Sequence, residues 1–228
     1  MKPALRVTRP AYVLALVLAA SAAVIGWMHT KSARPFLAAV GIHCPVDDVK
    51  LSDAVAIRKK GIASLAGNVP APSAAAIGGM QLQVSTQGDV RRWAALNRAS
   101  CETVNHGFTS LRCRGVMAAS LGIEGPPISE LWFSFGATEK LIGVDIYRRG
   151  LDSRGEQSAW SGAVDRLKTR LGVPTSSFGD ASPGNLAAAG YTTARVQYRY
   201  SDYIATVTAV NLPYAGFAVR EQYISAGS

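Results

Sequence analysis

Recognisable catalytic motifs are missing from this chain. It contains no GxSxG, no HExxH and no phosphate-binding Gly-rich loop, which are short signatures of hydrolases, metalloproteases and nucleotide-binding proteins. Its Asp and Glu residues are scattered, without a pair whose spacing suggests an acid/base couple. These absences predict a protein that is not an enzyme and that uses no cofactor.

A dense track of positive charge is also missing, although the net charge is +9. Residues 1–34 hold much of the excess, because they contain five basic residues and no acid. The densest basic run elsewhere, Arg58-Lys59-Lys60, fills a single helical turn. A protein that binds nucleic acid neutralises many phosphates at once. We therefore expect no nucleic-acid partner.

One long uncharged apolar run lies near the N-terminus. Residues 11–28 read AYVLALVLAASAAVIGWM, and a helix of that length rises about 27 Å, close to the roughly 30 Å of a bilayer core. The basic residues within 1–10 hold that end in the cytoplasm by the positive-inside rule. The run predicts a single-pass inner-membrane helix, with the rest of the chain in the periplasm. The alternative is a signal peptide cleaved after Ala20-Ser21-Ala22, but apolar residues continue past this site and favour the uncleaved anchor.

The chain after this run divides by composition. Residues 35–79 predict one helix and then a linker rich in Pro, Ala and Gly. Residues 80–150 and 151–228 each predict a helix followed by three antiparallel strands. Two helix starts show capping-box spacing, Thr86 with Asp89 and Ser153 with Glu156. The repeated order predicts a duplicated α+β domain.

Two consecutive strands of the first unit show their register. Alternating apolar residues predict a hairpin with one wholly apolar face, in which the pairs are Phe135 with Ile142, Phe133 with Val144, and Leu131 with Ile146. The same register places Trp132 across from Asp145 on the other face, with Tyr147 and Arg149 continuing that face. Trp, Tyr and Arg are typical of interface hot spots, so these four residues form the candidate interface. The alternative is that Trp132 packs against the other unit or a loop.

The three cysteines carry a prediction of their own. In the oxidising compartment that export implies, two of them are expected to pair. Cys101 follows the first helix and Cys113 lies in the next strand, so we expect a disulfide between them. A metal site that adds His106 is the alternative, although its spacing matches no zinc motif. Cys44 is then left over, as an unpaired thiol or as a bridge between two copies.

The stretch around these cysteines resembles one repeat of the secreted β-lactamase-inhibitor proteins. The similar features are a Thr four residues before an apolar helix position, Cys-Glu-Thr at the helix end, and Cys-Arg-Gly in the next strand. The residues that carry them are Thr86, Val90, Ser100-Cys101-Glu102-Thr103, Phe108 and Arg112-Cys113-Arg114-Gly115. That family has two helix-plus-sheet units and is related in fold to outer-membrane assembly lipoproteins of the SmpA/OmlA type. The resemblance implies this fold and a tendency to bind proteins, and it does not imply lactamase inhibition.

The predicted fold is therefore α+β, with an N-terminal transmembrane helix followed by a duplicated helix-plus-three-strand domain. The predicted function is a membrane-anchored periplasmic protein-interaction module whose partner is another envelope protein. Two alternatives stand beside it. One is a periplasmic enzyme or metal-binding protein that uses Cys101, His106 and Cys113, and the other is a structural subunit of an envelope assembly.

Overall fold

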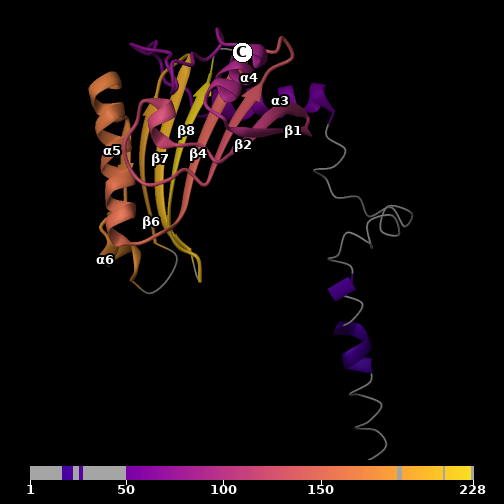
Figure 1. Cartoon of the computed structure of the whole chain (residues 1–228), viewed down its shortest axis with the longest axis vertical. Helices are drawn as coiled ribbons and strands as arrows, with labels where there is room; N and C mark the ends of the chain where they lie inside the picture. The colour runs from indigo at the N-terminus through magenta and orange to yellow at the C-terminus, as the bar shows by residue number, and fades with distance from the viewer. Residues whose placement is uncertain (1–16, 23–25, 28–49, 189–191, 213, 227–228) are drawn as a thin grey trace, which may run out of the picture. The chain divides into compact units, whose positions relative to one another are not determined.

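A single antiparallel sheet of eight strands dominates the structure (Figure 1). The computed structural model describes residues 17–22, 26–27, 50–188, 192–212 and 214–226. Lys50–Ser228 form one compact unit, separate from Met1–Val49. The strands are β1 Ser100–His106, β2 Phe108–Arg114, β3 Glu130–Phe135, β4 Leu141–Leu151, β5 Ser176–Phe178, β6 Thr193–Arg199, β7 Tyr203–Leu212 and β8 Gly216–Ser225. The helices of this unit are α3 Leu51–Ala63, α4 Gln87–Leu96, the short 3₁₀ helix η2 Ala118–Leu121, α5 Ser153–Leu171 and α6 Pro183–Leu186.

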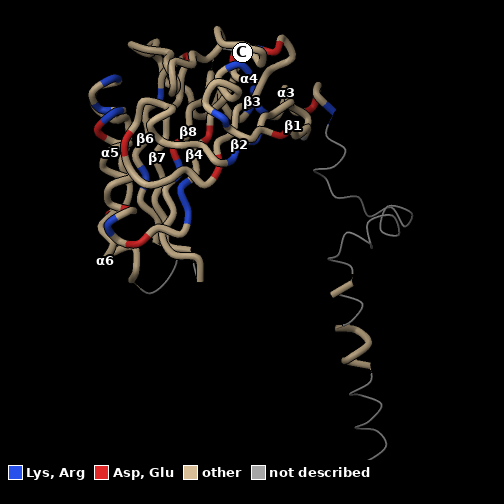
Figure 2. Tube along the Cα trace, in the orientation of Figure 1, with Lys and Arg blue, Asp and Glu red and all other residues tan. Residues whose placement is uncertain are grey.

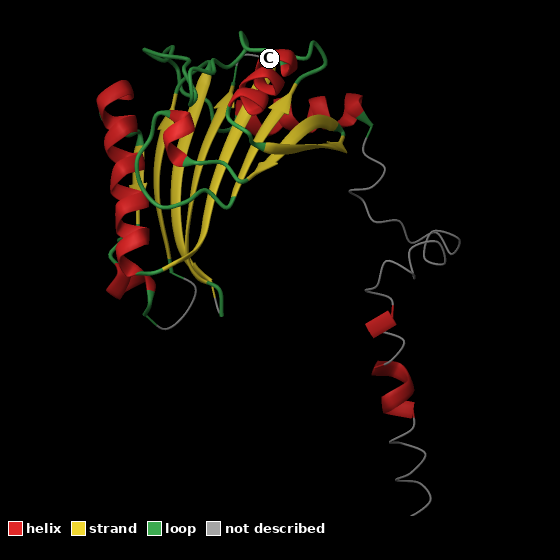
Figure 3. Cartoon of the chain, in the orientation of Figure 1, coloured by secondary structure: helices red, strands yellow, loops and turns green. Residues whose placement is uncertain are grey.

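The predicted duplication of the domain is wrong. The strands follow the order β1-β2-β3-β4-β8-β7-β6-β5, so the strands of the second half extend the sheet of the first half (Figure 3). The link is the pairing of β4 with β8, which runs from Gly143 opposite Ile224 to Leu151 opposite Phe217. Because backbone hydrogen bonds continue across this junction, both halves share one sheet and one hydrophobic core.

The predicted single-pass membrane anchor is also corrected. Of the apolar run at 11–28, residues 17–22 and 26–27 are described and helical, and the remainder lies outside the described residues. In the parts of the chain that the structure describes, no helix is long and apolar enough to cross a membrane. This finding contradicts the prediction of an inner-membrane protein with a periplasmic domain.

One face of the sheet is covered by helices and forms the core. We call the cross-strand set Leu111, Phe133, Val144, Tyr223, Ala205 and Tyr198 the apolar row, because each residue pairs directly with the next. Helix α5 packs against β4, β7 and β8, and its Ala159, Ala163 and Leu167 join the same core. The covered face is therefore sealed by α5 along its central strands.

The hairpin of β3 and β4 has the predicted register over most of its length. Leu131 pairs with Ile146, and Phe133 pairs with Val144, as expected. Near the turn the register shifts between Ser134 and Phe135, so that Phe135 pairs with Leu141 instead of Ile142. The shift leaves the apolar alternation of β3 on the core side, because Leu131, Phe133 and Phe135 are all buried.

Of the two predicted capping boxes, the one at α4 is present and the one at α5 is not. Thr86 and Asp89 form the predicted capping box, with Thr86 Oγ1 accepting from the Asp89 amide. At α5 the N-cap is Asp152, whose carboxylate accepts a hydrogen bond from the Gly155 amide at 2.7 Å. Glu156 is therefore free of a capping role and turns into the core, where it is fully buried.

The Pro-, Ala- and Gly-rich segment between α3 and α4 lies against the sheet. The Gly67 amide donates to the Tyr200 carbonyl at 3.1 Å, and the Ser201 amide donates to the Val69 carbonyl at 2.8 Å. A Cβ on Gly67 would lie 2.3 Å from the Arg199 carbonyl oxygen, so only glycine permits this close approach. Ala76, further along the segment, is fully buried. The segment that composition suggested as a linker is part of the packed unit.

Candidate interaction face of the sheet

A second cross-strand row crosses the sheet one residue away from the apolar row. We call it the polar row, and it consists of the directly paired residues Glu102, Arg112, Trp132, Asp145, Gln222, Thr206 and Gln197. Successive side chains of a strand point to opposite faces. The polar row therefore lies on the face away from α5, which we call the polar face.

Trp132 is half-buried at the centre of the β1–β4 part of this face. The Arg112 guanidinium carbon lies 5.4 Å from the centre of the Trp132 ring system, within the range of a cation–π interaction. The indole Nε1 donates a hydrogen bond to Glu130 Oε2 at 3.2 Å. Arg112 also forms an ion pair with Glu102. The indole is thus held by contacts to its ring and to its N–H.

Asp145, paired with Trp132 in the sheet, collects three hydrogen bonds on one oxygen. Arg220 donates to Oδ1 from Nε at 2.8 Å and from Nη2 at 2.6 Å, and Gln222 donates from Nε2 at 2.9 Å. Burial raises the pKa of Asp145 above its usual range, while the Arg220 guanidinium acts in the opposite direction. The carboxylate anchors the arginine in a defined position on the face.

Tyr147 lies between two arginines of the polar face. The Arg149 guanidinium carbon is 4.8 Å from the centre of its ring, and that of Arg220 is 5.3 Å away. Burial, followed by the charge of Asp145, raises the pKa of the Tyr147 hydroxyl. The ring is therefore a neutral, rigid platform between two cations.

Glu130 joins the Trp132 cluster to the Tyr147 cluster. Besides accepting from Trp132, its carboxylate lies 3.6 Å from Arg149 Nη1 and 3.7 Å from Arg114 Nη2. The two arginines remain accessible, with 48% and 57% of their side-chain surfaces exposed. Figure 2 shows charges of both signs interspersed along this part of the chain. The polar face is a connected array of arginines, carboxylates and aromatic rings.

The structure brings the four predicted interface residues together. Trp132 and Asp145 are direct cross-strand partners, Tyr147 pairs with Glu130 in the next position, and Arg149 stacks on Tyr147. Whether these residues form an interface stays a prediction. Sequence reasoning missed further members of the array, among them Arg112, Glu130 and Arg220. Arg112 lies between the buried residues Leu111 and Cys113, a pattern that was present in the sequence. The place of Arg220 depends instead on the β4–β8 pairing.

The predicted disulfide between Cys101 and Cys113 is confirmed. The two residues are direct partners in the β1–β2 ladder, and Cys113 is fully buried. Neither sulfur is a free thiol, which removes both from the proposed Cys101, His106 and Cys113 metal site. No group of three His, Cys, Asp or Glu side chains suited to a metal occurs among the described residues. Cys44 lies outside the described residues.

Comparisons with known proteins do not extend these observations. No protein family matches the chain, and neither a curated protein nor a solved structure does. The resemblance to the β-lactamase-inhibitor proteins stays a prediction.

Proposed function

We propose that this chain is a protein-binding module that docks its partner on the polar face of the sheet. The observation that carries the proposal is the clamping of Trp132 and Tyr147 by three arginines, Arg112, Arg149 and Arg220. Trp, Tyr and Arg are the residue types that contribute most binding energy in protein interfaces.

The rigidity of this array supports the proposal. Long side chains lose conformational entropy when a partner immobilises them, at a cost of roughly 0.5–1.5 kcal/mol each. On the polar face Arg220 is already held by Asp145, and Trp132 is already held by Glu130. Because these side chains are ordered before a partner binds, less of the contact energy is offset by lost entropy, and the affinity is higher.

The partly compensated charge of the array indicates the chemistry of the partner. Among the described residues, Arg114 and Arg149 share Glu130 as their ion-pair partner, at distances near the limit of an ion pair. These half-exposed guanidinium groups retain donors for additional acceptors. We infer a partner surface that supplies carboxylates at the rim and an apolar or aromatic group over Trp132. The resemblance to a protein-binding family points in the same direction.

A pull-down from an extract of the source cells, using the full chain as bait, tests the proposal. The Trp132→Ala/Arg149→Ala variant is compared with the wild type and with Leu96→Ala, which alters an exposed residue of α4. We expect a partner that the wild type and Leu96→Ala retain and that the double variant loses by at least about tenfold, because two hot-spot side chains are removed. Equal recovery by all three folded baits would rule out the polar face as the docking surface.

A further inference from the structure

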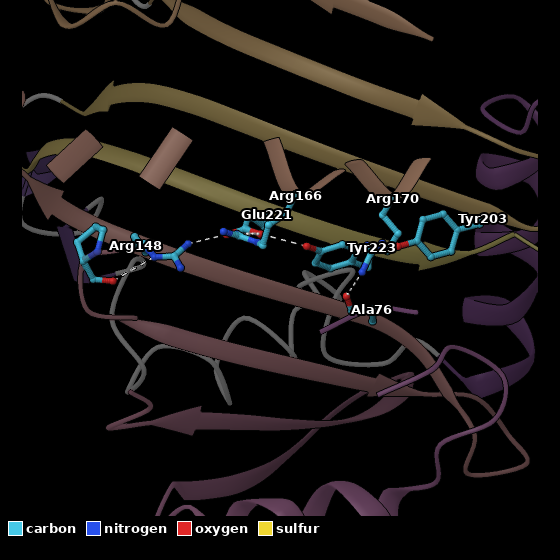
Figure 4. A network of polar contacts seen from close by, with 8 residues as sticks. Ala76, Arg148, Arg166, Arg170, Tyr203, Glu221 and Tyr223 are labelled. Atoms are coloured by element: carbon cyan, nitrogen blue, oxygen red, sulfur yellow. Dashed lines mark hydrogen bonds and ion pairs between the residues drawn. The ribbon is translucent and has the colours of Figure 1, made fainter. Parts of the chain in front are cut away.

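A buried polar network lies on the covered face, away from the proposed docking surface (Figure 4). At its centre Glu221 is fully buried and receives a hydrogen bond from Arg148 Nη1 at 2.6 Å. Arg166 Nη2 donates to both of its oxygens, at 2.9 and 2.8 Å, and the Tyr223 hydroxyl donates at 3.1 Å. The Glu221 carboxylate is thereby fully occupied by partners from β4, β8 and α5.

Arg170 continues the network one helical turn after Arg166 but has no carboxylate partner among the described residues. Its Nη1 donates to the Ala76 carbonyl at 2.8 Å, and its Nη2 donates to the Tyr203 hydroxyl at 3.0 Å. The guanidinium also lies 5.5 Å from the centre of the Tyr223 ring. All of these partners are neutral, so none of them offsets the positive charge of Arg170.

The network therefore has more cations than anions. Arg148 and Arg166 both pair with Glu221, and Arg170 lies against the neighbouring Tyr223. Among the described residues no second carboxylate forms an ion pair with any of the three arginines. Excess charge in a partly desolvated region is expensive unless a counter-charge accompanies it. The buried Nε atoms of Arg166 and Arg170 also have no acceptor within the described chain. Unused donors and uncompensated charge point to the same missing component, an anion.

A cavity lies where such an anion would bind. Arg166 and Arg170 line a pocket of about 270 Å³ together with the 75–81 loop and the segment from Leu121 to Ile123. Arg166, with 29% of its side chain exposed, also lines the adjoining pocket of about 390 Å³. Glu124 borders only the second pocket. The first pocket is therefore the more positive of the two.

A bend of two glycines, Gly78 and Gly79, lines the same pocket as the arginines. Gly78 and Gly79 both have positive φ, at 62° and 77°, and neither amide donates a hydrogen bond to a described residue. A Cβ on Gly78 would lie 2.8 Å from Leu121 Cδ2, whereas one on Gly79 would meet no atom within 4 Å. Consecutive unpaired amides at such a bend are a common way to bind the oxygens of an anion.

We propose that the pocket between Arg166, Arg170 and the Gly78–Gly79 bend binds one compact oxyanion, namely a phosphate or carboxylate group. Arg166 and Arg170 supply the charge, and the glycine amides supply additional donors. The bound group offsets the excess charge of the network and adds to the contact that Arg170 of α5 already makes with the 75–81 loop. This site is independent of the polar face and goes beyond the protein-binding role proposed above.

Thermal unfolding and amide NMR spectra of the full chain test the site, with inorganic phosphate and acetate as probes. Sodium chloride at matched ionic strength serves as the reference for general screening. At a hundredfold excess over its Kd, a bound probe raises Tm by roughly 5–10 °C. In the wild type we expect a saturable Tm rise and amide shifts centred on Gly78 and Gly79. A response to phosphate alone, or to acetate alone, identifies which oxyanion the site takes.

Two variants make the test specific. Arg166→Lys keeps a charge near Glu221 but loses the donor fork, and we expect its affinity for the probe to fall at least about tenfold. Arg195→Gln removes an exposed arginine from β6 and should bind the probe like the wild type. If Arg166→Lys is too unstable to examine, the changes in the amide chemical shifts of the wild type on adding each probe test the proposal instead. Shifts absent from Gly78 and Gly79, or equal responses to both probes and to chloride, would overturn the proposal.

Discussion

The two faces of the sheet hold the same chemical pair in opposite environments. On the covered face Arg148 and Glu221 are 1% and 0% exposed, whereas on the polar face Arg220 and Asp145 are 42% and 18% exposed. In both cases the shortest distance between nitrogen and oxygen is 2.6 Å. Geometry alone therefore does not distinguish the two pairs. The surroundings of the two pairs distinguish them. Where water is excluded, the attraction between the opposite charges is stronger, and removing one partner destabilises the folded protein far more.

This difference assigns separate roles to the faces. The buried pair ties β4 and β8 together beneath α5, at the junction that makes the sheet continuous. The half-exposed pair sets the position of Arg220 beside Tyr147, where a partner can reach it. We expect substitutions on the covered face to change stability and substitutions on the polar face to change binding.

The largest effect is expected from Glu221→Gln. The substitution removes the charge that compensates Arg148 and Arg166, and breaking a buried pair in this way costs about 3–5 kcal/mol. Urea unfolding of the variant and the wild type measures the difference in free energy of unfolding. A loss below about 1 kcal/mol would mean that the two faces do not differ in the way described.

A smaller effect, with a distinct pH dependence, is expected at Glu156. Burial raises the pKa of this carboxyl from 4.5 to about 7, and neither of its oxygens has a hydrogen-bond partner in the described chain. The folded protein thus holds the proton more tightly than the unfolded chain does. The contribution of Glu156 to the free energy of unfolding should therefore be fully present below pH 4.5, fall as the pH rises towards about 7, and be lost above it.

Glu156→Gln should remove this decline and stabilise the protein at pH 8 by about 1–3 kcal/mol. Urea unfolding at pH 5 and pH 8 compares the variant with the wild type. Glu139→Gln, which alters an exposed glutamate in the β3–β4 turn, is the matched control and should leave the pH profile unchanged. A profile that is the same for the wild type and Glu156→Gln would contradict the assignment.

The smallest effect on stability is expected from Asp145→Asn. The variant keeps the shape of the side chain and loses the ion pair with Arg220, which is worth less than about 1 kcal/mol at this exposure. Urea unfolding should show a correspondingly small change, in contrast to Glu221→Gln. A loss as large as that of Glu221→Gln would show that the polar face is a structural layer rather than an accessible surface.

Local patterns predicted local structure well. The alternation of apolar residues gave the right pairs for Leu131 and Phe133, because one buried face permits only one register. Thr86 and Asp89 also capped their helix as expected. The prediction for Ser153 and Glu156 was wrong because Asp152, one residue earlier, took the capping position. Which of two adjacent residues caps the helix depends on the backbone path of the preceding strand. The four-residue capping motif carries no information about that path.

Pairings between strands that are distant in the chain were harder to predict from the sequence. Two similar runs of helix and strands suggested two domains, but the pattern within each run does not say which strand edges will meet. The hydrogen bonds between β4 and β8 settle that question, and they also bring Arg220 to Tyr147 and Arg148 to Glu221. For the apolar run at 11–28, composition predicted a spanning helix, and the described residues contain no such helix.

The sequence by itself determined which side chains of a strand share a face, where α4 begins, and which two cysteines lie close enough to pair. Each of these depends on neighbours a few residues apart, or on the period of two along a strand. Only the tertiary structure decided that the two halves form one sheet, that Trp132 and Tyr147 are clamped by arginines from different strands, and that Arg166 and Arg170 line a cavity. Those contacts join residues distant in the chain, and their free energies appear only when burial removes the surrounding water.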